Sequence, residues 1–95
     1  MTYIYRYMND NGDIYYVGKA NDLEKRHKEH LREDSWCYES IHLEYILCND
    51  SYAFEVEAYF IDKLNPIYNK IRPKNHLLSF ELNSYVIDKH WERLF

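Results

Sequence analysis

The chain has 95 residues, which is enough for one small domain with a modest hydrophobic core. Hydrophobic residues make up 46% and charged residues 29%, with two glycines and two prolines, which argues against disorder and low complexity. No apolar run reaches the roughly 18–20 residues that cross a bilayer, and the first residues lack the layout of a signal peptide. We therefore expect a cytoplasmic protein without a membrane contact, in which Cys37 and Cys48 stay reduced.

The net charge of −4 is unevenly distributed along the chain. Residues 1–32 hold six Lys or Arg and five Asp or Glu, while residues 33–62 hold eight acids and no such base. Residues 63–95 hold six bases and three acids. The total argues against non-specific nucleic-acid binding by the whole surface, but the two mildly basic ends leave room for a local phosphate-binding face.

Two strands are predicted over residues 2–8 and 13–19, where tyrosines and β-branched residues alternate with other side chains. The Asn11-Gly12 pair between them is typical of a two-residue hairpin turn, because such turns need positive φ angles. That turn fixes which side chains face one another across the hairpin.

In this register, Tyr7 faces Tyr16, and Tyr5 faces Gly18. Tyr5 and Tyr16 then lie diagonally on one face of the hairpin, and Gly18 leaves open space beside the Tyr5 hydroxyl. A change of one residue in the register would place the two tyrosines on opposite faces.

A helix is predicted from an Asn21-Asp22 cap to about Glu33. Its inner face carries basic residues where an apolar stripe is expected. Side chains of residues 41–48 alternate in the pattern of a third strand. A second helix begins at residues 49–51 and ends at residues 64–65, before Pro66.

The last part of the chain is expected to hold a strand over residues 78–82 and a helix from about Ser84. Ile87, Trp91 and Leu94 would form the buried stripe of that helix. The fold class is therefore α+β, with a small, three-stranded, mostly antiparallel sheet flanked by helices in the order ββαβα and then a C-terminal helix. We expect one domain over residues 1–95, with its core at 3–69 and an extension at 70–95.

Glu57 is the most unusual residue of the second predicted helix. At about 100° per residue, it falls in the middle of an arc of apolar residues that includes Phe54, Ala58 and Ile61. A carboxylate in such a position is costly unless it is paired or bound to a cation. A salt bridge to a nearby base and a functional site both remain open at this point.

Arg26 and His30 are neighbours one turn apart on the first predicted helix. They offer a fixed guanidinium for a phosphate beside an imidazole that can titrate, although a solvated basic helix would give the same pattern. The five histidine and cysteine residues between 27 and 48 have spacings that match no usual zinc motif.

Together these segments resemble the GIY-YIG nuclease family. The resemblance covers residues 3–69, with Tyr3-Ile4-Tyr5 and Tyr16-Val17-Gly18 in place of the two tripeptides that name the family. Three further family motifs follow in order: the Arg-x3-His helix at 26–30, the Glu helix around Glu57, and the Pro-x-Tyr-Asn segment at 66–69. Tyr3 departs from the usual glycine, and Val17 replaces isoleucine.

The resemblance implies hydrolysis of DNA phosphodiester bonds with Mg²⁺, for which Mn²⁺ can substitute. It implies that Glu57 is the metal ligand, Tyr5 the general base and Arg26 the phosphate contact. Tyr16 would orient the phosphate or the water, His30 would share the proton transfer, and Asn69 would position the site. The predicted catalytic residues are thus Tyr5, Tyr16, Arg26, His30, Glu57 and Asn69.

DNA contacts are expected from basic residues near this site, namely Lys19, Lys25, Arg26, Lys70, Arg72 and Lys74. Residues 70–95 are too few for a second domain, so we expect weak sequence preference, a homodimer or a targeting partner. The alternatives are a catalytically inactive or partner-dependent nucleic-acid-binding module, and a structural domain. The last of these leaves the position of Glu57 unexplained.

Overall fold

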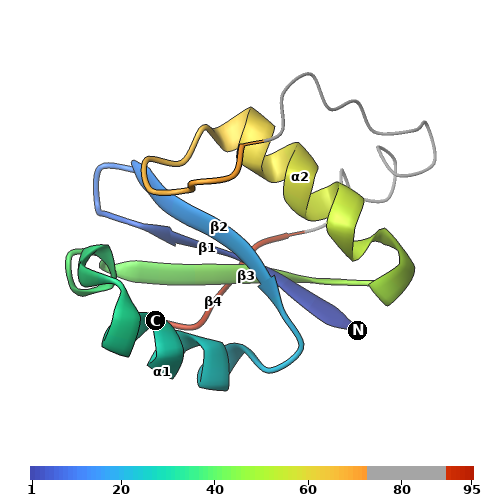
Figure 1. Ribbon diagram of the computed structural model, residues 1–95, viewed down its shortest axis with the longest axis horizontal. Helices are drawn as coiled ribbons and strands as arrows, with labels where there is room; N and C mark the ends of the chain where they lie inside the picture. Colours follow the sequence, from blue (N-terminus) through green and yellow to red (C-terminus); the bar gives the residue numbers. More distant parts are fainter. Residues whose placement is uncertain (73–89) are drawn as a thin grey trace.

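The computed structural model of the protein describes residues 1–72 and 90–95. Its centre is an antiparallel sheet with the strand order β2-β1-β3-β4, and α1 and α2 lie on opposite faces of this sheet (Figure 1). The elements are β1 Thr2–Met8, β2 Ile14–Ala20, α1 Leu23–Glu33, the 3-10 helix η1 Ser35–Tyr38, β3 His42–Cys48, the 3-10 helix η2 Asp50–Tyr52, α2 Ala53–Leu64 and β4 Glu92–Arg93. The predicted α+β class, with helices flanking the sheet, is confirmed.

Each face of the sheet buries its own part of the core. Ile4 and Ile46 pack with Val56 of α2 on one face, in a cluster that is purely apolar at its centre. On the other face Tyr5 and Tyr7 are fully buried in a second cluster, beneath α1 and η1. The alternation of β1 thus separates an aliphatic side from a tyrosine side.

The hairpin loop between β1 and β2 is longer than predicted. Asn9 accepts a hydrogen bond from Gly12 N at 3.2 Å, and its own N–H donates to Asp13 O at 3.2 Å. Gly12 has φ 86°, as a three-residue hairpin loop requires of the residue that follows its turn. The expected two-residue turn is therefore wrong.

A β-bulge cancels the effect of the longer loop. Met8 pairs with Ile14, but the next pair is Tyr7 with Tyr16, so Tyr15 is left opposite no residue. Beyond the bulge, Tyr5 pairs with Gly18, as predicted. The loop is one residue longer than predicted, and the bulge adds one unpaired residue to β2. These two changes offset one another, so Tyr5 and Tyr16 still lie on one face of the hairpin.

Both main helices begin and end close to the predicted positions. Asp22 caps α1 through its side chain, which accepts a hydrogen bond from Lys25 N at 3.1 Å. After α2, Asn65 takes the left-handed conformation, with φ 49°. One detail of α2 differs from the prediction: Phe54, expected in the buried apolar arc, is 70% exposed. Part of that arc faces a cavity, while Ala53 and Val56 face the sheet.

The fourth strand is the main difference from the expected sheet. The predicted C-terminal helix is wrong over residues 90–95, where β4 pairs with β3 through Glu44 and Arg93. Glu44 is 8% exposed, and its carboxylate accepts hydrogen bonds from Arg6 and Arg93, at distances down to 2.7 and 3.0 Å. This double ion pair attaches the last residues to the sheet. The strand expected over 78–82 lies outside the described residues.

The helices of the described residues are too short or too polar to cross a membrane.

We expect the substitution Glu44→Gln to lower the free energy of unfolding by about 2–3 kcal/mol at pH 7, because two arginines lose their ionised partner. Burial opposes ionisation of Glu44, but the arginine hydrogen bonds outweigh burial and lower its pKa below the ordinary 4.5. The stability from this carboxylate is therefore present above pH 4.5 and is lost as the pH falls through the lowered pKa. Urea unfolding between pH 7 and pH 3 measures both effects. Equal pH dependence in the variant and the wild type would contradict the role of Glu44.

Candidate active site

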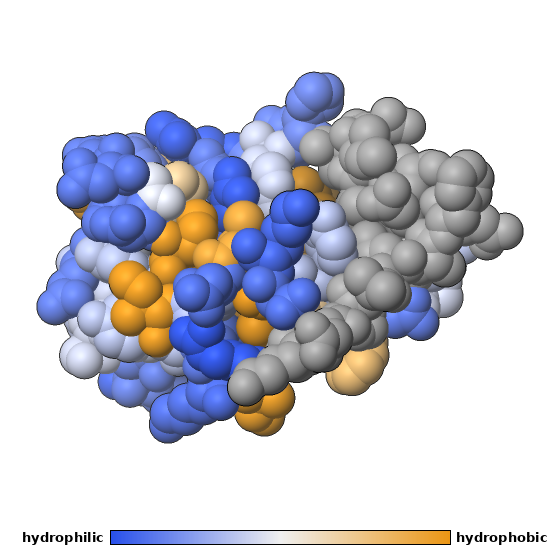
Figure 2. Space-filling model, turned by 90° about the horizontal axis from the view of Figure 1, so that it is seen from above, coloured by the Kyte–Doolittle hydropathy of each residue, from blue (hydrophilic) through white to orange (hydrophobic). Residues whose placement is uncertain are grey.

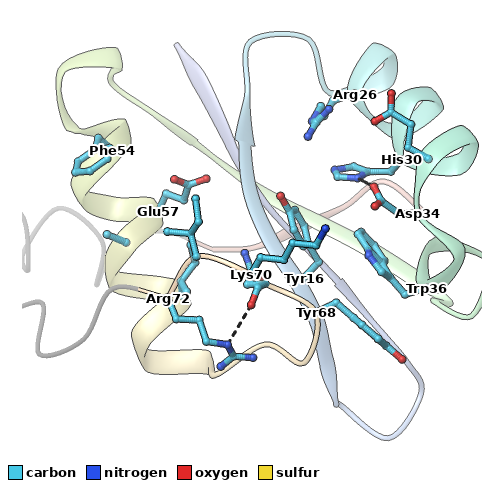
Figure 3. A pocket seen from close by; sticks show the side chains of 15 residues that line it. Tyr16, Arg26, His30, Asp34, Trp36, Phe54, Glu57, Tyr68, Lys70 and Arg72 are labelled. Carbon is cyan, nitrogen blue, oxygen red and sulfur yellow. Dashed lines mark hydrogen bonds and ion pairs between the residues drawn. The ribbon is translucent and has the colours of Figure 1, made fainter.

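A cavity of about 600 Å³ lies beside β2, which is an outer strand of the sheet. Side chains of α1 and α2 approach it from the two faces of the sheet, and the segment after α2 lies in front of it (Figure 3). The residues that line it are Tyr16, Arg26, His30, Glu33, Asp34, Trp36, Phe54, Glu57, Ala58, Ile61, Tyr68, Asn69, Lys70, Ile71 and Arg72.

The fold brings the predicted catalytic residues together, although they come from five separate segments. All but one of them line the cavity. The exception is Tyr5, which is 1% exposed and lies behind the wall, joined to it by a hydrogen bond with His30. Their roles in catalysis stay a prediction.

Three polar side chains form a chain of hydrogen bonds through this wall. The Tyr5 hydroxyl lies 2.7 Å from Nε2 of His30, and Nδ1 of His30 lies 2.7 Å from Oδ2 of Asp34. A similar pair lies beside it, where the Tyr7 hydroxyl is 2.7 Å from Nδ1 of His27. The histidines that replace the apolar stripe of α1 thus satisfy the buried tyrosine hydroxyls.

Gly18 is required by the position of Tyr5. A Cβ atom on Gly18 would lie 2.5 Å from the Tyr5 hydroxyl oxygen and 2.9 Å from the Tyr16 ring. The sequence predicts open space at Gly18, beside the Tyr5 hydroxyl. In the structure, the end of the Tyr5 side chain itself occupies the space that a side chain on residue 18 would need.

Arg26 lines the cavity and interacts electrostatically with both Tyr5 and Tyr16. Burial raises the pKa of both Tyr5 and Tyr16, and the Arg26 guanidinium opposes this effect on each of them. Burial also disfavours the cation of Arg26, but Tyr5, Tyr16 and Glu29 outweigh it and raise its pKa. Among the described residues its ion pair is to Glu29, at 3.5 Å, so this half-exposed cation can exchange partners.

Glu57 faces the same cavity from α2 (Figure 3). It is half-buried and has no hydrogen bond or ion pair with residues 1–72 or 90–95. Burial raises its pKa, and the nearby Lys19 lowers it only partly. The carboxylate is therefore partly desolvated and has no hydrogen-bond or ion-pair partner among the described residues.

The donor set around Glu57 suits one type of metal site. Within the described ranges, no three His, Cys, Asp or Glu side chains gather as a metal site. Mg²⁺ needs fewer protein ligands, because one or two carboxylates, several waters and substrate phosphates complete its coordination. A carboxylate that faces a cavity and has no ion pair within the described part of the chain fits this ion, and it does not fit structural zinc, which takes four protein ligands.

The predicted DNA-binding residues are placed less uniformly. Lys70 lines the cavity and is exposed, whereas Lys19 and Lys25 are exposed outside its lining. Arg72 lines the cavity too, but it donates to Asn65 Oδ1 at 2.5 Å, to Pro66 O and to Asn69 O. It therefore holds the end of α2 as well as facing the cavity. Lys74 lies outside the described residues.

Asn69 has a structural contact that the sequence did not reveal. Its side chain donates to Val17 O at 2.8 Å and accepts from Val17 N at 2.9 Å. Beside it, the N–H groups of Ile67 and Tyr68 donate to the carbonyls of Ile14 and Tyr15. The segment after α2 is thus bonded to the outer edge of β2, which fixes one wall of the cavity.

Several lining residues were missed in the sequence. Trp36 stacks on Tyr16, with ring centroids 4.9 Å apart and planes at 17°, and nothing in the local pattern of η1 indicates this contact. Asp34 did carry a signal, since an acid four residues after a histidine shares its helix face.

Apolar side chains gather among charged ones on the surface seen from above in Figure 2. Phe54 and Ile71 are both exposed, and they also line the cavity.

Residues 1–72 match the family model described as the GIY-YIG catalytic domain. The chain belongs to this family. It is also similar to the UvrABC system protein C of Campylobacter jejuni strain 81-176, with 35% identity over 81 residues that cover 70% of this chain. The corresponding protein of Bartonella henselae is 31% identical over 74 residues, which cover 70% of this chain. No solved structure gives a significant match.

The GIY-YIG chain spans only a small part of these relatives, 14% of the Campylobacter protein and 11% of the Bartonella protein. The matched family segment, residues 1–72, contains all six predicted catalytic positions. The membership therefore makes this chain a domain of a nuclease family.

The substitution Gly18→Ala tests the packing behind the cavity wall. We expect it to displace Tyr5 from His30, because the added Cβ meets a hydroxyl and ring that are buried and cannot withdraw. The expected cost is about 1–3 kcal/mol of stability, with loss of nuclease activity greater than the loss of folded protein. Thermal unfolding and a cleavage assay measure the two effects. Unchanged stability would mean that the neighbouring rings adjust freely.

Proposed function

We propose that this GIY-YIG domain is a DNA endonuclease that hydrolyses phosphodiester bonds with a divalent metal ion, Mg²⁺ or Mn²⁺. The observation that carries this proposal is the position of Glu57. Its carboxylate is partly desolvated and has no hydrogen-bond or ion-pair partner in residues 1–72 or 90–95. It shares one cavity with the Arg26 cation, although the two residues lie on helices that cover opposite faces of the sheet. Family membership supports the same chemistry.

The proposed roles follow from the groups that each residue presents to the cavity. Glu57 would hold the metal ion, which supplies charge stabilisation for the phosphate and the leaving 3′ oxygen. Arg26 would exchange Glu29 for the scissile phosphate and offset its growing negative charge. Tyr16 would orient the phosphate or the attacking water from the β2 side. Asn69 would act at a distance, by holding the segment after α2 against β2.

Tyr5 would accept a proton from the attacking water. Its buried phenol has a raised pKa, so it needs both a proton acceptor and a nearby cation to act near neutral pH. His30 offers an acceptor at 2.7 Å, and Arg26 offers the cation.

The proposal includes DNA as the substrate, and either a homodimer or a targeting partner. The UvrABC relatives contain much additional chain beyond the part that matches this one. We propose that the domain contacts the DNA backbone through Lys70 and its basic neighbours, and takes its specificity from outside this site.

Cleavage of supercoiled plasmid with Mg²⁺ or Mn²⁺ tests the proposed activity. We expect nicking or linearisation by the wild type, and no cleavage by Glu57→Gln or in EDTA. Glu55→Gln is the matched control, because Glu55 is an exposed carboxylate on the same helix. Metal-dependent binding or cleavage that survives in Glu57→Gln would show that the metal site lies elsewhere. A folded wild type that binds but does not cut plasmid, branched or single-stranded DNA would favour an inactive binding module.

The same substitution separates function from stability. Burial raises the pKa of Glu57, so its ionised form costs stability once the pH rises through that raised value. Glu57→Gln removes this cost, and we expect its melting temperature at pH 7 without metal to equal or exceed that of the wild type. A clear fall in the melting temperature would mean that Glu57 is held by an ion pair.

Lys70→Glu tests the DNA contact at the cavity. We expect weaker binding to duplex DNA of any sequence, and a logarithmic salt slope smaller by about 1, because one phosphate contact is lost. Lys28→Glu is the matched control, since Lys28 is exposed on α1 and does not line the cavity. Fluorescence anisotropy at several salt concentrations measures both slopes. Equal slopes for the two variants would remove Lys70 from the DNA contact.

A further inference from the structure

Asp34 is a cavity residue that the proposed function does not use. Its Oδ2 atom lies 2.7 Å from Nδ1 of His30, and the other ring nitrogen, Nε2, lies 2.7 Å from the Tyr5 hydroxyl. His30 is 1% exposed, so both ring nitrogens are committed to these two partners. The three side chains form one continuous line from the core to the cavity, where Asp34 is half-exposed.

The partner of Nδ1 determines the direction of the hydrogen bond at Nε2. An ionised carboxylate can only accept a hydrogen bond, so a proton must lie on Nδ1 of His30. In a neutral imidazole Nε2 then carries a lone pair. Consequently the Tyr5 O–H donates to His30, and the phenol proton already points toward the atom that can accept it.

In the described part of the chain, the Asp34 side chain makes no hydrogen bond other than the one to His30. It makes no capping hydrogen bond, although the residue lies between α1 and η1. The hydrogen bonds that join these helices use its backbone: Asp34 N donates to His30 O at 2.8 Å, and Asp34 O accepts from Cys37 N at 3.0 Å. We therefore expect α1 and η1 to keep their structure when the carboxylate is replaced.

We propose that Asp34 is a positioning residue that holds His30 in the Nδ1–H tautomer, so that Nε2 of His30 takes up the Tyr5 proton during phosphodiester hydrolysis. This inference rests on the proposed nuclease function and adds the residue that sets the direction of proton flow. The arrangement resembles the aspartate–histidine pair of serine hydrolases, with a phenol in place of the serine hydroxyl.

The proton balance of this step is simple. The O–H bond of Tyr5 breaks and an N–H bond forms at Nε2 of His30, which gives a phenolate and an imidazolium beside the Asp34 carboxylate. The phenolate takes a proton from a water molecule, whose oxygen bonds to phosphorus as the bond to the 3′ oxygen breaks. The leaving oxygen takes a proton from solvent water, and His30 releases its proton to solvent.

Other charged groups near His30 do not replace Asp34. From α1, Arg26 lowers and Glu29 raises the pKa of His30, and neither is within hydrogen-bond distance of its ring. Burial is the largest influence and keeps the ring neutral at rest, while Asp34 opposes burial. The remaining titratable groups that face the ring or its hydrogen-bond partners are Tyr5 and Tyr7 of β1, Tyr16 of β2, and His27 of α1.

The kinetic test compares Asp34→Asn with Glu39→Gln, which removes the same charge from an exposed position nearby. We expect the single-turnover cleavage rate of Asp34→Asn at saturating DNA to fall about 10–100-fold, with unchanged DNA affinity. Because Asp34 raises the pKa of His30, the acid limb of the pH–rate profile should move to lower pH in this variant. A purely structural role would not move that limb. A wild-type rate and profile in Asp34→Asn would overturn the proposal.

A second measurement does not depend on nuclease activity. Nitrogen-15 NMR of the histidine rings in the metal-free, DNA-free protein identifies which nitrogen of His30 carries the proton. We expect Nδ1–H in the wild type and a shift toward Nε2–H in Asp34→Ala. Nε2–H in the wild type, or the same tautomer in both proteins, would overturn the positioning role. If the wild type cuts no DNA, the proposed function fails, and the NMR result still decides whether Asp34 sets the tautomer.

Discussion

The outer edge of β2 is the constraint on which the candidate site depends. A strand at the edge of a sheet presents unpaired N–H and C=O groups, which must be covered or hydrated. Here the segment after α2 covers them: Ile67 and Tyr68 bond through their backbones, and Asn69 bonds through its side chain to both polar groups of Val17. The same contacts bring Lys70 close to residues of α1, which are far away in the sequence.

The site also explains why the two faces of the sheet are so different. On the α2 face the core is aliphatic and leaves the Glu57 carboxylate at its rim, with no partner in the described chain. On the α1 face, tyrosine hydroxyls and histidine rings are buried together and satisfy one another. Such polar groups stabilise a small core only when their hydrogen bonds are complete. The fold therefore places a partly desolvated carboxylate, which lowers stability, on one face of the sheet. On the other face it buries polar side chains that are stable only when all their hydrogen bonds form.

Much of this arrangement could be predicted from local sequence patterns. Strand alternation, the Asp22 cap and the helix end before Pro66 each reflect interactions within a few residues, so their positions follow from the sequence. The residue types of the site could also be named, since an acid on an apolar helix face and an Arg–His pair are visible without a structure.

The features that could not be predicted depend on contacts between distant segments. Phe54 has the hydropathy of a core residue, but its helix face turns partly toward the cavity. Residues 92–93 pair with β3 because Glu44 binds Arg93, and a helical periodicity around Trp91 says nothing about that contact. Asp34 was overlooked because an acid near the end of a helix is usually a solvated residue, and only the burial of His30 makes it significant.

The bulge at Tyr15 has a consequence for how the hairpin could be redesigned. In a regular strand, successive carbonyl groups point to opposite edges, yet Ile14 O and Tyr15 O both accept hydrogen bonds from the segment after α2. The bulge turns these two neighbouring acceptors outward together, and so supplies the anchor for that segment. An engineered hairpin with a perfect two-residue turn and no bulge would preserve the tyrosine register, but it would lose one of these anchors and loosen the wall that carries Lys70. The irregular hairpin is thus part of the site's architecture.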